Sequence, residues 1–229
     1  MIVNKSSQSI LLVFASSLEA KTLSEWLQSF DKERDTYILN GLGVRLLVTG
    51  PGIFHSVYSV MKVLSSEKPG LIIDAGICGS FGRCKIGEVI QVKQDEFADC
   101  GFTLADGTFV SVFDMNFVDA DAPPFSGGKL KLSTFDDLPL PEVKAITVNQ
   151  CSGSEVQIKR RVKDFRADIE TMEGAAVAYA AMKEDIDFRQ IRSVSNQVEV
   201  RNRDSWDIPQ AVSNLTDVLK SILIKKAGL

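Results

Sequence analysis

The chain has 229 residues, of which 45% are hydrophobic and 24% are charged. This length and apolar fraction suffice for one compact domain that buries about 70–75% of the surface exposed by the unfolded chain. The 26 Lys and Arg residues against 30 Asp and Glu residues give a net charge of −4. The charge balance therefore argues against nucleic-acid binding.

The composition also narrows the class of protein and its surroundings. With 16 Gly and 7 Pro and no low-complexity tract, the chain is neither collagen-like nor largely disordered. The four cysteines form no C-x-x-C pair, and one histidine leaves too few ligands for a Cys/His metal cage. We therefore expect a globular protein with reduced thiols, in the cytoplasm, that uses no metal and no cofactor.

A short apolar run near the N-terminus, residues 10–14, faintly imitates a signal peptide. A signal core needs about 7–15 apolar residues, so we interpret the run as a first buried strand. No stretch approaches the ~20 apolar residues of a membrane span, and we expect no membrane partner.

Strand and helix patterns alternate along the chain. In chain order, the predicted strands are residues 10–14, 46–48, 71–73, 88–92, 145–148 and 191–194, and the predicted helices are residues 18–30, 53–64, 172–182 and 208–224. This alternation predicts a mostly parallel sheet covered by helices, in which ligands bind where strands end.

Residues 99–144 do not follow the alternation. Turn residues interrupt them too often for a long element, as in Asp106-Gly107 and Pro123-Pro124, so we predict hairpins and loops. Such an excursion is either a lid or partner-contacting segment or a decorative insertion. We expect a single domain over residues 1–229, without internal repeats, that carries this loop-rich excursion at about 99–144.

Carboxylates at strand ends are the first candidates for chemistry. Glu19 follows the first predicted strand, where it would face the binding edge of the sheet. A helix-capping glutamate is the alternative explanation. Glu170 and Glu173, spaced i and i+3 at the start of a predicted helix, could point the same way.

Glycines cluster after two predicted strands, as T-G-P-G at 49–52 and G-I-C-G-S-F-G at 76–82. Neither cluster has the spacing of a dinucleotide-binding or phosphate-loop motif. Close approach of the backbone to a ligand and tight turns remain as interpretations. Cys78 lies in the second cluster and could line a pocket, although a small core residue is the plainer explanation.

Five motifs in order resemble the superfamily of purine nucleoside phosphorylases and methylthioadenosine nucleosidases over nearly the whole chain. They are Glu19 after a strand, T-G-P-G at 49–52, D-A-G-I-C-G-S at 74–80 with I-G-E-V-I at 86–90, I-E-T-M-E-G-A-A at 169–176, and R-S-V-S-N at 192–196. The stretches T-V-N-Q-C-S-G-S at 147–154 and S-N-Q-V-E-V-R-N-R-D-S-W-D-I-P at 195–209 resemble the futalosine hydrolase branch.

The resemblance implies a fold and an assembly. The fold is an α/β protein, a three-layer α/β/α sandwich with a mixed, partly barrel-like central sheet. The assembly is a homodimer or higher homo-oligomer whose neighbouring subunit helps to close a pocket for a small-molecule nucleoside.

The resemblance also implies roles in cleaving the C1′–N9 bond of a purine nucleoside through an oxocarbenium-like sugar. Glu19 matches the catalytic carboxylate that deprotonates the attacking water. Glu173 matches the carboxylate that binds the ribose hydroxyls. Met172 would pack against the ribose, and Cys78 and Gly79 would lie beside the ribose and base.

Asn196 departs from the adenine-specific nucleosidases, which have Asp at this position and use it to help protonate N7. A side-chain amide can donate to O6 or N7 of a 6-oxopurine and accept from N1–H, whereas an ionised carboxylate only accepts. Asn196 therefore points to hypoxanthine as the leaving base and to futalosine as the nucleoside.

Ile77 is a second departure, because the phosphorylases have a phosphate-binding serine at this position. Losing that donor favours water over phosphate as the nucleophile. Arg45 or Arg83 could still supply an anion site.

Futalosine carries a carboxybenzoyl extension at the 5′ end of its ribose, which needs an apolar slot and a cation. Arg201 or Arg203 could hold its carboxylate. Phe113, Phe117 and Phe125 of the excursion are alternative parts of the pocket or of a dimer interface.

Other functions stay open at this point. They are a methylthioadenosine or aminofutalosine nucleosidase, a purine nucleoside phosphorylase, and a non-catalytic nucleoside-binding protein. Proteins of the last kind typically lack the water-activating carboxylate, whereas Glu19 is present.

Overall fold

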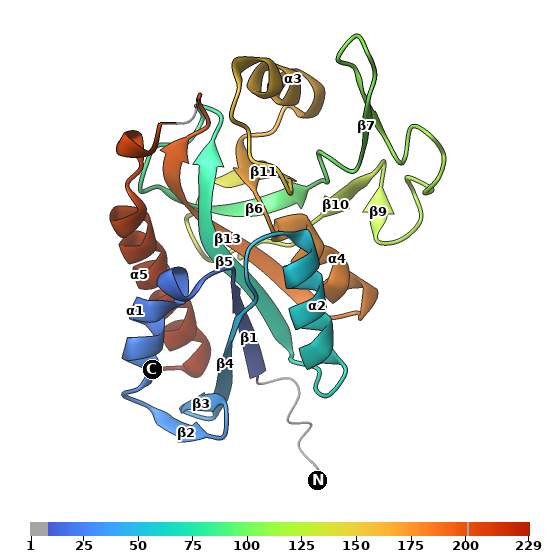
Figure 1. Ribbon diagram of the computed structural model, residues 1–229. Coiled ribbons are helices and arrows are strands. Elements are labelled where there is room, and N and C mark those ends of the chain that lie inside the picture. The colour runs from blue at the N-terminus through green and yellow to red at the C-terminus, as the bar shows by residue number, and fades with distance from the viewer. Residues whose placement is uncertain (1–8, 201) are drawn as a thin grey trace.

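A computed structural model describes residues 9–200 and 202–229 (Figure 1). The helices are α1 (Ser17–Leu27), α2 (Ile53–Leu64), α3 (Glu155–Phe165), α4 (Gly174–Lys183) and α5 (Ile208–Ala227), with a short 3-10 helix at Arg203–Ser205. The strands are β1 (Ser9–Phe14), β2 (Asp31–Glu33), β3 (Thr36–Leu39), β4 (Leu42–Val48), β5 (Leu71–Ser80), β6 (Val89–Asp95), β7 (Gly101–Thr103), β8 (Phe109–Ser111), β9 (Phe125–Ser126), β10 (Lys129–Lys131), β11 (Glu142–Thr147), β12 (Ile169–Thr171) and β13 (Asp187–Gln197).

The central sheet is mixed and closes on itself. β1 runs parallel to β4 and β5. Further along, β5 pairs with β12, β12 with β11, β11 with β6, β6 with β13, and β13 again with β5. The pairs β5–β12 and β6–β13 are antiparallel, and the others of this ring are parallel. The predicted mixed, partly barrel-like sheet is confirmed.

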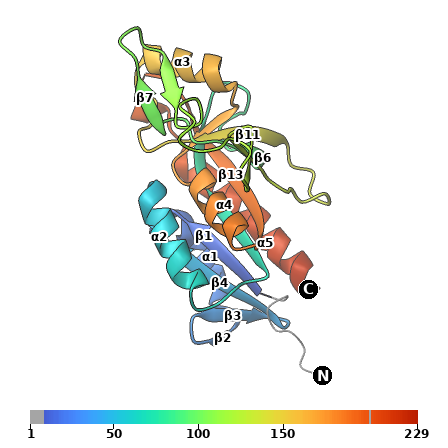
Figure 2. The ribbon, with the colours of Figure 1, turned by 90° about the vertical axis from the view of Figure 1, so that its right-hand side faces the viewer.

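Two apolar cores lie on opposite faces of the sheet. Successive side chains of β1 point to opposite faces, so Leu12 packs in one core with Leu23 of α1 and Leu219 of α5, whereas Leu11 packs in the other with Val60 of α2. Helices α1 and α5 lie on one side of the sheet, and α2 and α4 on the other (Figures 1 and 2). This arrangement gives the predicted three layers.

The excursion contains two small hairpins. β7 pairs with β8 in a separate sheet, and β9 pairs with β10, which joins β6 at an edge of the main sheet. The hairpin of β7 and β8 lies beside α3 in both views (Figures 1 and 2). No helix in the described part of the chain is long and apolar enough to cross a membrane.

Some element boundaries differ from the predictions. Residues 76–80, predicted as a glycine loop, continue β5. Gly76 and Gly79 are required there because side chains from other elements approach the backbone closely, and not because the chain turns. The helix predicted from residue 172 begins at Gly174, so Met172 and Glu173 precede it. The hairpin β2–β3, the strand β12 and the helix α3 were not predicted.

Candidate active site

Glu19 lies at the start of α1, where the chain leaves the end of β1. Its side chain is buried and completes a capping box, in which Ser16 N and Ser16 Oγ donate to Glu19 Oε2 at 2.9 and 2.6 Å. Ile77 N of β5 donates to Glu19 Oε1 at 3.0 Å. The carboxylate therefore caps the helix with one oxygen and faces β5 with the other.

A buried arginine that the sequence analysis did not single out lies beside this carboxylate. Arg192 of β13 is 2% exposed and forms an ion pair with Asp74 of β5. A Cβ added to Gly76 would lie 2.8 Å from both Arg192 Nη1 and Glu19 Oε1. The two charged atoms therefore converge over Gly76, and the missing side chain of this glycine makes room for them.

Four charged side chains influence one another here: Glu19, Asp74, Glu173 and Arg192. Burial raises the pKa of Asp74 to about 6 and the pKa of Glu173 to about 7. The Arg192 guanidinium opposes both increases, and the Glu19 carboxylate adds to them. Glu19 and Glu173, 154 positions apart in the chain, thus belong to one electrostatic cluster with a single buried cation.

Glu173 and Glu170 point in different directions. Gly52 N, in the T-G-P-G turn after β4, donates to Glu173 Oε1 at 2.9 Å. Glu170 instead accepts from Ser152 N and Arg161 Nη1, both at 2.7 Å. The expectation that the two glutamates share a direction is wrong, because Glu170 belongs to β12 and not to a helix.

Asn196 lies above Gly79, near the end of β13. A Cβ added to Gly79 would lie 3.3 Å from Asn196 Nδ2 and 2.7 Å from Val198 Cγ2. Ser195 Oγ donates to Asn196 Oδ1 at 2.8 Å, and Asn196 Nδ2 donates to Gln197 O at 2.8 Å. The amide is thus held at the strand end, where the register with β5 shifts between Val194 and Asn196.

Two further predicted residues lie on the same strands. Cys78 of β5 is 4% exposed and packs in an apolar cluster with Ile90 and Val194. Burial raises the pKa of its thiol, which makes the side chain a poor nucleophile. Met172 is half-buried and directly precedes Glu173.

The predicted aromatic residues of the excursion divide into two groups. Phe113 and Phe125 meet edge to face with ring centroids 5.0 Å apart, and Phe125 stacks on Tyr179 of α4 at 5.5 Å. Phe125 therefore packs the excursion against α4, and Phe113 packs against Phe125. Phe117, in contrast, is 78% exposed.

Of the four arginines considered as anion sites, two have carboxylate partners and two have side chains that the structure does not describe. Arg45 and Arg83 each form an ion pair with a carboxylate of the chain. Arg201 lies outside the described residues, and of Arg203 only the backbone is described, at the start of the 3-10 helix. The structure therefore gives no contact of Arg201 or of the Arg203 side chain.

A buried polar network lies beneath the N-terminus of α4, next to Glu173. Asp95 is fully buried, and Thr147 Oγ1 lies 3.0 and 3.1 Å from its two carboxylate oxygens. Ala175 N of α4 donates to Thr147 Oγ1 at 2.8 Å. The network ties β6 and β11 to the helix end that follows Glu173, where a negative charge is favourable.

Asp95→Asn should change the pH dependence of stability. Burial raises the pKa of Asp95 to about 7, so between pH 4 and pH 7 the folded protein holds a proton that the unfolded chain has released. That contribution to stability is complete below pH 4 and lost as the pH rises to about 7, with a slope of at most about 1.4 kcal/mol per pH unit. In urea titrations the variant should therefore gain stability relative to wild type from pH 5 to pH 7.5, and a constant difference would contradict the assignment.

The chain belongs to the phosphorylase superfamily, whose family model matches residues 9–224. Among its relatives is a futalosine hydrolase of Acidothermus cellulolyticus, 29% identical over 180 residues, or 74% of this chain and 71% of that protein. A 5′-methylthioadenosine/S-adenosylhomocysteine nucleosidase of Maridesulfovibrio salexigens is 27% identical over 172 residues, or 70% of this chain and 71% of that protein. The superfamily resemblance and the prediction of a nucleosidase-class enzyme are confirmed.

The fold is shared with solved structures of this class. The native structure of futalosine hydrolase of Helicobacter pylori aligns with a TM-score of 0.78, covering 96% of this chain and 98% of that chain at 17% sequence identity. At this identity the comparison supports the fold.

Proposed function

We propose that this chain hydrolyses futalosine to hypoxanthine and dehypoxanthine futalosine, a step of menaquinone biosynthesis, in the cytoplasm. The observation that carries the proposal is the convergence of Glu19 Oε1 and Arg192 Nη1 over Gly76, within the cluster that includes Glu173. Futalosine hydrolase relatives at 29% identity support the choice of substrate.

Glu19 is the general base of the proposed reaction. Its Oε2 accepts hydrogen bonds from the Ser16 N–H and O–H groups. Its Oε1 accepts one hydrogen bond from Ile77 N and has a second lone pair that can take a proton from water. As the C1′–N9 bond breaks, the bonding electrons leave with the base and the water oxygen bonds to C1′. Arg192, whose Nη1 converges with Oε1 over Gly76, supplies a buried positive charge that interacts with this carboxylate.

Glu173 binds the ribose hydroxyls in the proposed complex. One carboxylate oxygen already accepts from Gly52 N, so the group is oriented before substrate arrives. Its negative charge would strengthen hydrogen bonds from the hydroxyls and offset the positive charge of the oxocarbenium-like sugar. Met172 and Gly79 are proposed to lie against the ribose and the base.

Asn196 is proposed to recognise the base. Its amide lies over Gly79, and by rotating to face a 6-oxopurine it can donate to O6 or N7 and accept from N1–H. As the base receives the C1′–N9 electrons it takes up one proton at N7 from solvent and leaves as neutral hypoxanthine, while Glu19 keeps the proton of the attacking water. Cleavage of an adenine nucleoside is the rival function, favoured by the nucleosidase relative at 27% identity.

Asn196→Asp should shift the preference for the base. An ionised carboxylate cannot donate to O6, so we expect the ratio of kcat/KM for futalosine to that for aminofutalosine to fall by about 100-fold. Asn116→Asp, an exposed change in the excursion, is the control and should leave the ratio unchanged. Equal ratios in the wild type and Asn196→Asp would assign base recognition to another residue.

A substrate panel tests the proposed function itself. Purified protein is incubated without phosphate with futalosine, aminofutalosine, methylthioadenosine or inosine, and the released bases are separated by chromatography. We expect hypoxanthine from futalosine to form fastest. Faster release of adenine would favour the rival function, and a requirement for phosphate would favour a phosphorylase.

We also propose that the protein is a homodimer through the exposed face of α2. Phe54, Tyr58 and Met61 lie at i, i+4 and i+7 on this helix and are 66%, 68% and 36% exposed. Such an apolar stripe is typical of a protein interface. Sedimentation should give a dimer for the wild type and a monomer for Tyr58→Glu, and a wild type that stays at 25.1 kDa at all concentrations would contradict the dimer.

A further inference from the structure

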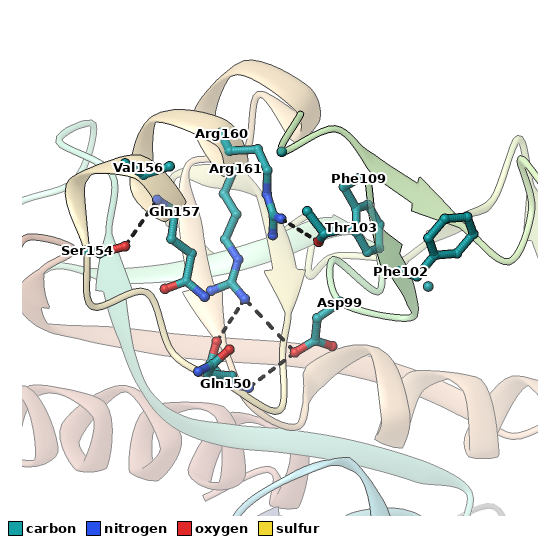
Figure 3. A pocket seen from close by; sticks show the side chains of 12 residues that line it. Asp99, Phe102, Thr103, Phe109, Gln150, Ser154, Val156, Gln157, Arg160 and Arg161 are labelled. Atoms are coloured by element: carbon teal, nitrogen blue, oxygen red, sulfur yellow. Dashed lines mark hydrogen bonds and ion pairs between the residues drawn. The ribbon is translucent and has the colours of Figure 1, made fainter. Parts of the chain in front are cut away.

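A cavity of about 530 Å³ lies between α3 and the β7–β8 hairpin (Figure 3). Phe102 and Phe109 of the hairpin, Arg160 and Arg161 of α3, and Asp99 and Gln150 are among the residues that line it. None of the four residues of the electrostatic cluster, Glu19, Asp74, Glu173 and Arg192, lines it. Its volume suits a small organic molecule.

The charge of Arg161 is already compensated within the protein. This side chain is 1% exposed, and its terminal nitrogens donate to Glu170 Oε2 at 2.7 Å and to Gln150 O at 2.8 Å. Asp99 Oδ2 lies 4.0 Å from Arg161 Nη2 and also accepts hydrogen bonds from Asn149 N and Gln150 N. Asp99, the acidic residue of the cavity lining, therefore already accepts hydrogen bonds from the backbone of the protein.

Arg160, in contrast, has no carboxylate partner among the described residues. Its guanidinium lies over the Phe109 ring, 5.3 Å from the centroid, and Nη1 donates to Thr103 Oγ1 at 3.1 Å. The Nε atoms of both Arg160 and Arg161 are buried and have no acceptor in the described part of the chain. One uncompensated cation, Arg160, thus lines the cavity.

We propose that this cavity binds an aromatic carboxylate. The carboxylate pairs with the Arg160 guanidinium, whose planar fork suits two parallel hydrogen bonds. The aromatic ring packs against Phe109, which lies on the same face of the hairpin as Thr103 and the Arg160 guanidinium. An aliphatic acid would leave the Phe109 ring without an aromatic partner, and a neutral ring would leave the cation unpaired.

A short series of contacts connects the cavity to Glu173. Gln150, which lines the cavity, follows Asn149, whose Oδ1 accepts from Ile53 N at 3.2 Å. Ile53 follows Gly52, which donates to Glu173. The aromatic carboxylate therefore has two sources: the carboxybenzoyl extension of the proposed substrate, which rests on the proposed function, or a free aromatic acid.

Binding of a fragment tests the site without any turnover. Isothermal titration of the full chain with 3-acetylbenzoate should show binding that weakens about tenfold in Arg160→Gln. Lys159→Gln, which removes the same charge from the neighbouring exposed position of α3, should bind like wild type. No binding to wild type, or equal binding by wild type and Arg160→Gln, overturns the site whatever the enzyme cleaves.

Turnover then distinguishes the two sources. Inosine has the same base as futalosine and lacks the extension. If the extension occupies the cavity, the ratio of kcat/KM for futalosine to that for inosine should fall about tenfold in Arg160→Gln and stay at the wild-type value in Lys159→Gln. An unchanged ratio together with Arg160-dependent fragment binding assigns the same site to a free acid.

Discussion

Glu19→Gln should lower kcat for nucleoside hydrolysis by about 10²–10⁴-fold, the usual contribution of a general base. The amide cannot take a proton from water at neutral pH. Glutamine can still serve in a capping box with Ser16, so α1 should form. Steady-state kinetics with futalosine measures the loss, and circular dichroism checks the helix content.

The matched control for this variant is Glu25→Gln on the same helix. Glu25 is exposed and pairs only weakly with Lys21 at 4.0 Å, so its removal should leave kcat within a factor of two. A Glu19→Gln enzyme that retains wild-type turnover would show that another group activates the water.

Arg192→Met should destabilise the protein by about 3–5 kcal/mol, the usual result of removing one partner of a buried ion pair. The substitution leaves Asp74 without its ion-pair partner and removes the buried positive charge that interacts with Glu19 and Glu173. The pKa of Asp74 should rise further, so the destabilisation should be largest above pH 7 and smaller at pH 5, where more of the carboxyls are protonated. Urea denaturation at the two pH values measures the difference.

Two further variants test whether loss of the ion pair, and not a general packing defect, accounts for the lower stability of Arg192→Met. Arg83→Met removes an arginine that is 61% exposed, and such surface pairs contribute about 0–1 kcal/mol. Replacing Asp74 by Leu in the Arg192→Met background should recover part of the lost stability, because no unpaired carboxylate remains at that position. If the double variant is less stable than Arg192→Met, the ion pair does not explain the loss.

The order of the main elements was predictable because their apolar residues repeat with clear periods. The helix at 53–64 has the bounds expected, and β1 was found within one residue. The helix α3 was missed because it packs few apolar residues, and Arg161 is its buried side chain. Local periodicity cannot reveal a helix that is fastened by ion pairs to distant residues.

The site was only partly predictable for a similar reason. Glu19, Glu173 and Asn196 stand in motifs that the family resemblance marks, and their positions at strand ends follow from an alternating α/β pattern. Arg192 and Asp74 were overlooked although each is a charged residue in an apolar strand, a pattern that usually means a buried pair. The pairing of β5 with β13 across more than a hundred residues brings them together, and the sequence carries no local signal for it.

Isotope labelling tests the central claim, that Glu19 directs water and not phosphate to C1′. Futalosine is cleaved in H₂¹⁸O in the presence of phosphate, and the products are analysed at once by mass spectrometry. We predict free hypoxanthine and dehypoxanthine futalosine with one ¹⁸O at the C1′ hydroxyl, and loss of this product in Glu19→Gln. A sugar 1-phosphate without ¹⁸O would contradict the account.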